Sequence, residues 1–158
     1  MASKNSWLLL LLSCATVTGI VGDIIMRPSC STGWFYYRSN CYGYFRKLQS
    51  WSDAELECQS FGNGAHLASV LDAKEARVIA KHIWGYQRNQ PVWIGLNDPQ
   101  KNNKWKWIDG GLFLFRSWAD KSFRTDKSCA EMSYQSNFLT WNKNHCSKPQ
   151  HFLCKYRP

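Results

Sequence analysis

Acidic side chains are scarce in this sequence of 158 residues, which holds 11 Asp and Glu against 20 Lys and Arg and has a formal net charge of +9. Such an excess of positive charge favours anionic partners, among them sulfated glycans, acidic lipids and nucleic acid. A basic surface that serves only solubility explains the charge equally well. The charge balance therefore narrows the class of partner without selecting one.

Long apolar stretches are also missing, since no run approaches the roughly 20 residues that a helix needs to span a bilayer. The sequence opens instead with basic Met1–Lys4, a short apolar run over Trp7–Leu12 and small residues up to Gly22, in the order of a secretory signal peptide. We predict cleavage after Gly22, with a retained signal anchor as the alternative. No repeat or low-complexity linker follows, so we expect one secreted, extracellular domain over 23–158 that does not insert into a membrane. That compartment argues against nucleic acid as a partner.

Motifs of catalysis and of metal binding are absent. No Gly-x-Ser-x-Gly, His-Glu-x-x-His or glycine-rich phosphate loop occurs. Cys-x-x-Cys pairs are missing and the four histidines lack the spacing of zinc ligands. The sequence also has no Asn-x-Ser or Asn-x-Thr acceptor for N-glycosylation. We therefore expect a protein that is not an enzyme and needs no cofactor.

Cysteines, by contrast, are present in an even number once Cys14 leaves with the signal peptide. In a secreted chain this predicts a disulfide framework, although the sequence alone does not choose among the pairings. The six are Cys30, Cys41, Cys58, Cys129, Cys146 and Cys154. An aromatic-rich hairpin predicted over 33–46, with its turn at 38–40, brings the first two close enough to bridge.

Two amphipathic helices follow this hairpin. We expect the first to start at Ser52, with Ser52 and Glu55 as a capping box and Trp51 and Leu56 as a hydrophobic staple, and to end at Gly62 or Gly64. Its helical spacing turns Cys58 to the core. The second is predicted from a capping box of Asp72 and Glu75 to a closing Gly85, with one apolar face made of Ala76, Ile79, Ala80 and Ile83.

Strands dominate the second half of the chain. The run 92–96 reads as a buried strand, 98–103 as a polar turn, and 104–108 as an alternating strand that places Trp105 and Trp107 on one face. A turn over 109–111 and an irregular segment over 119–128 follow. Three further strands are predicted at 129–132, 138–141 and 151–156.

Four anchor segments in this arrangement resemble the C-type lectin-like domain: Trp93–Leu96, Trp105–Trp107, Cys129–Met132 and His151–Cys154. The resemblance covers nearly the whole mature chain. It implies an α+β fold with two helices, antiparallel sheets, a long loop region and three disulfides. It also implies the pairs Cys30–Cys41, Cys58–Cys154 and Cys129–Cys146.

Within that superfamily the chain is similar to the secreted regenerating (Reg) proteins, which consist of a signal peptide and one domain. The stretches Asp23–Cys30 and Cys41–Lys47 are similar to the fourth type of that family. Reg proteins are linked to epithelial growth and repair, so the resemblance supports two functions. The chain is either a lectin or a secreted factor that signals through a protein receptor with incidental sugar affinity.

The calcium site of the superfamily is missing its ligands here. Family members supply oxygens from a Glu-Pro-Asn or Gln-Pro-Asp triplet before the fourth of the six cysteines, and from Trp-Asn-Asp in the next strand. The segment 120–127 has no such triplet, and the strand reads Trp141-Asn142-Lys143. Because calcium needs six to eight oxygens and an ammonium repels it, we predict no metal at this position. The missing triplet also weakens an antibacterial function, which the family associates with Glu-Pro-Asn.

Carbohydrate would then bind elsewhere, without calcium. Two polar clusters at strand ends offer amides, hydroxyls and charges, and loops at such places carry function. Ordinary turn chemistry explains the same composition. The predicted carbohydrate-binding residues are Asp98, Pro99, Gln100, Lys101, Asn102 and Asn103 in the first cluster and Gln135, Ser136 and Asn137 in the second.

A basic surface is predicted near these clusters, and it suits sulfated or phosphorylated glycans. Scattered, solvated lysines with no common ligand explain the same residues equally well. Its members are Lys101, Lys104, Lys106, Lys143 and Lys148. The function expected from the sequence is a secreted, monomeric, calcium-independent lectin at epithelial surfaces. Its expected ligands are mannan-like or anionic polysaccharides.

Overall fold

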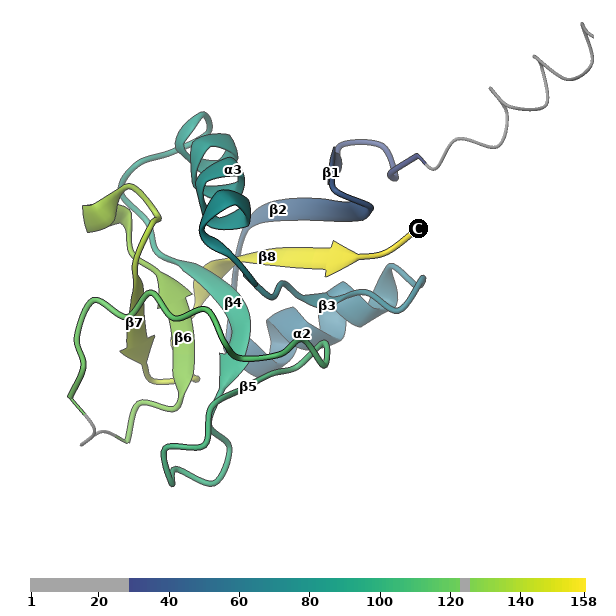
Figure 1. The fold of residues 1–158 in the computed structure, drawn as a ribbon. Helices are drawn as coiled ribbons and strands as arrows, with labels where there is room; N and C mark the ends of the chain where they lie inside the picture. The colour runs from purple at the N-terminus through teal and green to yellow at the C-terminus, as the bar shows by residue number, and fades with distance from the viewer. Residues whose placement is uncertain (1–28, 123–125) are drawn as a thin grey trace, which may run out of the picture.

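The computed structural model describes residues 29–122 and 126–158, and shows two helices against one sheet (Figure 1). The signal peptide predicted over 1–22 lies outside the described residues. Over the part of the chain that is described, no helix is long and apolar enough to cross a membrane. The α+β class predicted from the sequence is confirmed.

The eight strands form a single mixed sheet in the order β1-β2-β8-β4-β6-β7, with β3 added to β8 and β5 added to β4. All pairings are antiparallel except that of β4 with β8, which is parallel. The strands are β1 (Phe35–Tyr37), β2 (Asn40–Gln49), β3 (His66–Leu67), β4 (Val92–Asn97), β5 (Lys106–Trp107), β6 (Cys129–Met132), β7 (Trp141–Asn144) and β8 (Gln150–Tyr156). The predicted first hairpin is β1–β2, and its turn residues Arg38 and Ser39 have positive φ.

Helix α3 (Ala73–Trp84) follows the prediction closely. The Asp72 carboxylate accepts from the backbone N–H of Glu75 at 2.7 Å, and Gly85 ends the helix. The four predicted apolar residues of its inner face are all buried. The second half of the capping box is wrong, because the Glu75 carboxylate accepts from Leu71 N–H, Tyr42 O–H and Lys155 instead. The carboxylate stays at the helix N-terminus but binds Leu71 N–H, one residue before the cap, and the buried ammonium of Lys155.

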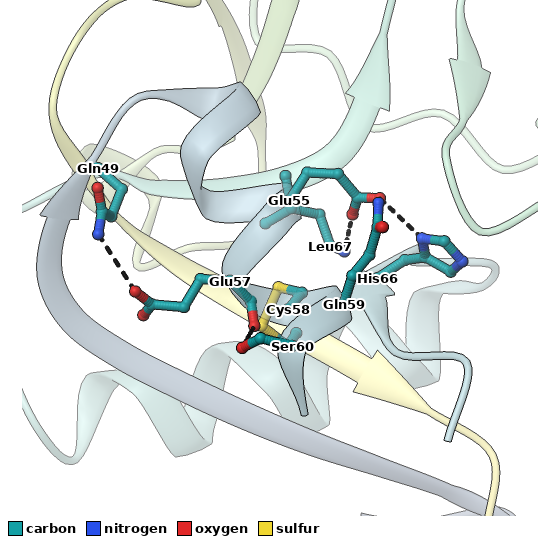
Figure 2. The surroundings of a disulfide bond; sticks show 9 residues. Gln49, Glu55, Glu57, Cys58, Gln59, Ser60, His66 and Leu67 are labelled. Carbon is teal, nitrogen blue, oxygen red and sulfur yellow. Dashed lines mark hydrogen bonds and ion pairs between the residues drawn. A yellow bond between two sulfur atoms is a disulfide. The ribbon is translucent and has the colours of Figure 1, made fainter. Parts of the chain in front are cut away.

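Helix α2 (Trp51–Ser60) begins two residues earlier than a Ser52 cap predicts, because Ser50 is the N-cap and accepts from Asp53 N–H. Glu55 is buried instead of capping, and accepts from the Leu67 N–H at 2.8 Å and from His66 at 2.7 Å (Figure 2). Leu56 is 63% exposed, so the predicted staple is wrong. The Glu55 prediction is wrong because His66 and Leu67 of β3, which pack on this helix, bind its carboxylate.

The strand predicted over 138–141 is displaced to β7, which starts at Trp141. Before it, Tyr134–Ser136 form a 3₁₀ turn, and Asn137 and Phe138 have positive φ of 55° and 67°. The turn holds because Ser136 Oγ accepts from Thr140 N–H at 2.9 Å. The strand predicted over 104–108 is likewise shortened to β5.

Three disulfides close the fold in the pairing that the resemblance implies: Cys30–Cys41, Cys58–Cys154 and Cys129–Cys146. The second joins α2 to β8, and both of its cysteines are fully buried (Figure 2). Two main apolar clusters fill the interior, one between α3 and the sheet and one around α2. This core supports a long irregular segment, 108–122, which returns to the sheet through a bridge between Trp118 and Trp141.

Candidate functional site

Lys143 on β7 stands where other members of the superfamily have a calcium ligand, and its neighbours hold it in place. Its ammonium donates to the carbonyl oxygen of Ser122 at 2.6 Å. It also lies 5.0 Å from the ring centre of Trp118 and 5.9 Å from that of Trp105, within the range of cation–π attraction. A fixed positive charge therefore stands where the resemblance places a metal ligand.

A polar pocket of about 460 Å³ lies on one side of Lys143. It contains two carboxylates, Asp120 and Glu131, and both are engaged. Asp120 accepts from the Ser122 backbone N–H and hydroxyl, and these hydrogen bonds lower the pKa of its carboxyl. Glu131 is buried and accepts from the Asn144 amide; burial raises the pKa of its carboxyl.

This donor set fits calcium poorly. Three lysines line the same pocket as its two carboxylates, namely Lys127, Lys143 and Lys148. Within the described ranges no group of three or more His, Cys, Asp or Glu side chains is arranged to hold a metal ion. Calcium takes six to eight oxygens, mostly anionic, so the chemistry here opposes it.

The first predicted sugar cluster is a tight loop after β4. Asp98 is 5% exposed, and its carboxylate accepts from the backbone N–H groups of Asn102 at 3.3 Å and Asn103 at 2.8 Å. It therefore shapes the loop instead of facing solvent. The other five residues of the cluster are exposed: Pro99, Gln100, Lys101, Asn102 and Asn103. Of these, Pro99, Gln100 and Asn102 line a depression of about 210 Å³.

The second predicted cluster is the 3₁₀ turn before β7. The Ser136 hydroxyl is used within the turn, whereas Gln135 and Asn137 are exposed. Asn137 borders an apolar depression of about 270 Å³ together with Trp84 of α3, which is 40% exposed. The Arg88 guanidinium covers one face of the Trp84 ring, with its carbon 3.3 Å from the ring centre. An amide beside a partly exposed aromatic ring is a pairing that suits a sugar, because the ring packs on an apolar face and the amide bonds a hydroxyl.

The structure does not bring the two clusters together. In the antiparallel pair β4–β6, Asn97 lies opposite Cys129 and Val92 lies opposite Met132. The first cluster follows Asn97 and the second follows Met132, so they stand at opposite ends of this pair (Figure 1). Four lysines of the predicted basic surface border neighbouring pockets: Lys148 and Lys143 line the polar pocket, and Lys104 and Lys106 line the depression beside the first cluster.

A further pocket, of about 470 Å³, was not predicted from the sequence. Its aromatic wall is formed by Trp105, Phe113 and Trp118. Lys143 borders it and the polar pocket alike. The basic residues Lys104 and Lys143 were identified from the sequence, but the aromatic residues beside them lie on both sides of β5, Trp105 before it and Phe113 and Trp118 after it. The sequence feature that could have indicated this pocket is the number of aromatic residues between 105 and 118.

Comparisons with known proteins agree with this architecture. Residues 47–156 match the family model "Lectin C-type domain". The chain is 68% identical over 158 residues to regenerating islet-derived protein 4 of Homo sapiens, covering all of both chains, and 62% identical over 158 residues to that of Rattus norvegicus, again covering both. Among solved structures, human lithostathine is similar with a TM-score of 0.77 at 34% identity, covering 84% of this chain and 94% of that one. The P91S mutant of human regenerating gene type IV protein has a TM-score of 0.67 at 67% identity, covering 83% and 100%.

Proposed function

The chain belongs to the C-type lectin domain family, and within it to the regenerating proteins, and we propose that it is a secreted lectin that binds carbohydrate without calcium. The function is one of binding, with no catalytic step. The single observation that carries the proposal is the Lys143 ammonium, held between Ser122 and two tryptophan rings.

The position of Lys143 supports calcium independence for an electrostatic reason. Two like charges a few ångströms apart repel even at the surface of a protein, and the repulsion grows with the charge of the ion. Lys143 is half-buried and hydrogen-bonded, so it does not swing freely away from an incoming metal. A sugar that binds this domain must then use protein groups alone.

We assign neutral, mannose-type sugars to the two exposed polar loops. Gln100 and Asn102 present amides on the first loop, which Asp98 rigidifies through its two backbone hydrogen bonds. On the second loop Asn137 presents an amide beside Trp84, and Gln135 presents another exposed amide two residues before it. Rigid loops lose less conformational entropy on binding, so weak contacts suffice for measurable affinity. We place this activity at epithelial surfaces, with the protein as a monomer.

A glycan array with and without EDTA tests the proposal. We expect mannan binding to be unchanged by EDTA, because no protein–sugar contact runs through a metal. Loss of binding in EDTA would contradict the calcium-independent mechanism. Absence of binding to any glycan would contradict the function as a whole.

Loop variants locate the site. We expect Gln100→Ala with Asn102→Ala, or Gln135→Ala alone, to weaken mannan binding, each by about tenfold for a lost hydrogen bond of roughly 1.4 kcal/mol. Asn89→Ala removes an exposed amide from the loop before β4 and serves as the matched control. If the loop variants bind as the control does, the two loops are not the site.

Competition on cells separates the lectin from a receptor ligand. A lectin is displaced by soluble mannan or heparin, whereas a factor held by a protein receptor remains bound. Persistent binding in excess of both polysaccharides would favour the receptor.

A further inference from the structure

We propose that the aromatic pocket bordered by Lys143 is a separate site for a pyranose that carries a sulfate or carboxylate group. This inference rests on the proposed lectin function and extends it, because it assigns anionic sugars to a pocket beside the first polar loop. The pocket, hereafter the tryptophan pocket, is lined by Asn103 at the end of that loop, by aromatic and basic side chains from residues 104–121 and by Lys143 of β7.

The aromatic wall provides a stacking surface. The rings of Trp105 and Trp118 lie 4.9 Å apart at an interplanar angle of 65°, so together they form a corner and not a closed stack. Both are only partly buried and pack against the core beneath them. The C–H face of a pyranose packs on such a surface as other apolar groups do, and the rings keep their orientation because the core supports them.

The rim of the pocket is positively charged. Four cations line it, Lys104, Arg116, Lys121 and Lys143, and no carboxylate does. Among the described residues none of the four forms an ion pair within 4.0 Å. Clustered like charges repel one another, so an anion in their midst is attracted by all four. Arg116 adds a planar fork of donors that matches sulfate and carboxylate oxygens.

Lys143 is held by a hydrogen bond and by two aromatic rings, and its position sets the depth at which the charge of a ligand would sit. Its bond to the Ser122 carbonyl uses one ammonium hydrogen and leaves two for a ligand. Its cation–π contacts with Trp105 and Trp118 join the charged and aromatic parts of the pocket. One ligand can therefore contact the rings with its apolar face and Lys143 with its anionic substituent.

The adjoining polar pocket suits such a ligand less well. Its lining includes the carboxylates of Asp120 and Glu131, which repel an anion, and it contains no aromatic ring. The tryptophan pocket has a volume of about 470 Å³, which falls within the range of roughly 300–1,000 Å³ found for small-ligand sites. Size, charge and apolar surface therefore coincide in one place.

NMR titration of the folded protein with a sulfated heparin disaccharide provides a site-specific test. We expect the indole N–H signals of Trp105 and Trp118 to shift. The indole N–H groups of Trp51 and Trp93 donate to backbone carbonyls in the core and serve as internal controls that stay in place. A glucuronic acid disaccharide in a second titration distinguishes carboxylate from sulfate as the preferred group. Shifts in neither titration, or equal shifts of all four indoles, would overturn the proposal.

Charge-removing variants test the rim. Arg116→Gln with Lys121→Gln should weaken binding of the sulfated disaccharide at least about tenfold, as expected for the loss of two charge-assisted contacts. Arg46→Gln with Lys74→Gln removes the same charge from β2 and α3, where both residues are exposed, and should bind as the unmodified protein does. If both double variants lose affinity equally, only net charge matters and the site is refuted.

Mannan binding separates this inference from the proposed function. We expect mannan binding by the Arg116→Gln/Lys121→Gln variant to be unchanged, because neither residue belongs to the two polar loops. Mannan binding without disaccharide binding would refute the tryptophan pocket and leave the lectin function intact. Binding of neither ligand would refute both.

Discussion

The ammonium of Lys155 is buried, 6% exposed, in the middle of the molecule. It lies 3.3 Å from both carboxylate oxygens of Glu75 and donates to the hydroxyl and carbonyl of Ser69. Tyr42 O–H also donates to Glu75, at 3.0 Å, and burial together with that carboxylate raises the pKa of the tyrosine. Each polar group in this cluster therefore depends on its neighbours.

Removal of one partner should expose that dependence. We expect Glu75→Ala to lower the free energy of unfolding by about 3–5 kcal/mol, since it leaves a buried ammonium without its counter-charge. Glu75→Leu with Lys155→Met should recover much of the loss. Urea titration measures both. Lys47→Ala breaks the exposed pair with Glu57 and should cost less than about 1 kcal/mol. Equal losses at the two pairs would contradict the role of burial.

His151 predicts a pH dependence of stability. Burial lowers the pKa of its imidazole, with the Arg46 charge as a smaller cause, from an ordinary value of 6.5. The unfolded chain then binds a proton more readily than the folded one as the pH falls below about 6.5. The stability contribution of neutral His151 is present above that pH and is lost as the pH falls through the lowered pKa.

His151→Gln should therefore flatten the decline of the melting temperature between roughly pH 6.5 and 5, because it removes one of the groups that titrate there. Glutamine also keeps a partner for the Tyr44 hydroxyl, which lies 2.8 Å from His151 Nδ1. His145→Gln replaces an exposed histidine and is the control. An unchanged profile in His151→Gln would show that this histidine does not couple to folding.

At the scale of single elements, the crossing of β3 over β4 requires a glycine. A Cβ atom on Gly95 would lie 2.3 Å from the Leu67 carbonyl oxygen and 2.9 Å from Ile108 Cγ2. Gly95 N–H also donates to the Ala68 carbonyl at 2.9 Å. The shortest of these contacts is with backbone, which cannot rotate out of the way as the end of a flexible side chain can.

Gly95→Ala should thus destabilise the protein by about 1–3 kcal/mol or more, as overpacking of a tight core does. Gly85→Ala, at the end of α3 with an ordinary φ of −68° and a nearest contact of 3.3 Å, should change stability by less than about 1 kcal/mol. Guanidinium titration compares the two. A Gly95→Ala protein as stable as Gly85→Ala would show that the crossing relaxes easily.

Elements with their own start and stop signals could be predicted from the sequence. Helix α3 is an example, because Asp72 and Gly85 mark its two ends locally. The predicted start of α2 is two residues late because both Ser50 and Ser52 are suitable N-caps. The capping role predicted for Glu55 is wrong because its partners, His66 and Leu67, are more than ten residues away in the sequence. The strand predicted over 138–141 is wrong in its first three residues. The β propensity of this stretch gives no sign of the preceding turn, in which Asn137 and Phe138 have positive φ.

The candidate site was less accessible to sequence reasoning for a similar reason. The loop residues Gln100 and Asn102 were identifiable because their polarity is local. That Asp98 is buried follows from backbone geometry that composition does not reveal. The tryptophan pocket required Trp105, Trp118 and Lys143 to meet across separate segments, and only the sheet pairing places them together.

At the scale of the whole molecule, the disulfides differ in the length of chain that they close. Cys58–Cys154 spans 96 residues, whereas Cys30–Cys41 spans 11. In the chain-entropy model these loops correspond to about 4.7 and about 2.8 kcal/mol of stabilisation. The longer one also lies fully in the core. Stability should therefore depend most on the bridge between α2 and β8.

We expect Cys58→Ala with Cys154→Ala to lower the free energy of unfolding by more than Cys30→Ala with Cys41→Ala, by about 2 kcal/mol on the entropic difference alone. Urea titration of the two double variants under one set of conditions measures this. The reverse order would show that residual structure in the unfolded chain already brings α2 and β8 together.

Strand β8 lies between β2 and β4, so the middle of the sheet is filled by the segment that is synthesised after both of its neighbours. Before β8 has been synthesised, β2 and β4 each have one unpaired edge. Cys58 likewise lacks its native partner, which lies 96 residues further on. Cys129 and Cys146, only 17 residues apart, meet early. The order of synthesis therefore makes the last bridge to form the one on which the fold depends most, because Cys58 has no native partner until residue 154 has been made.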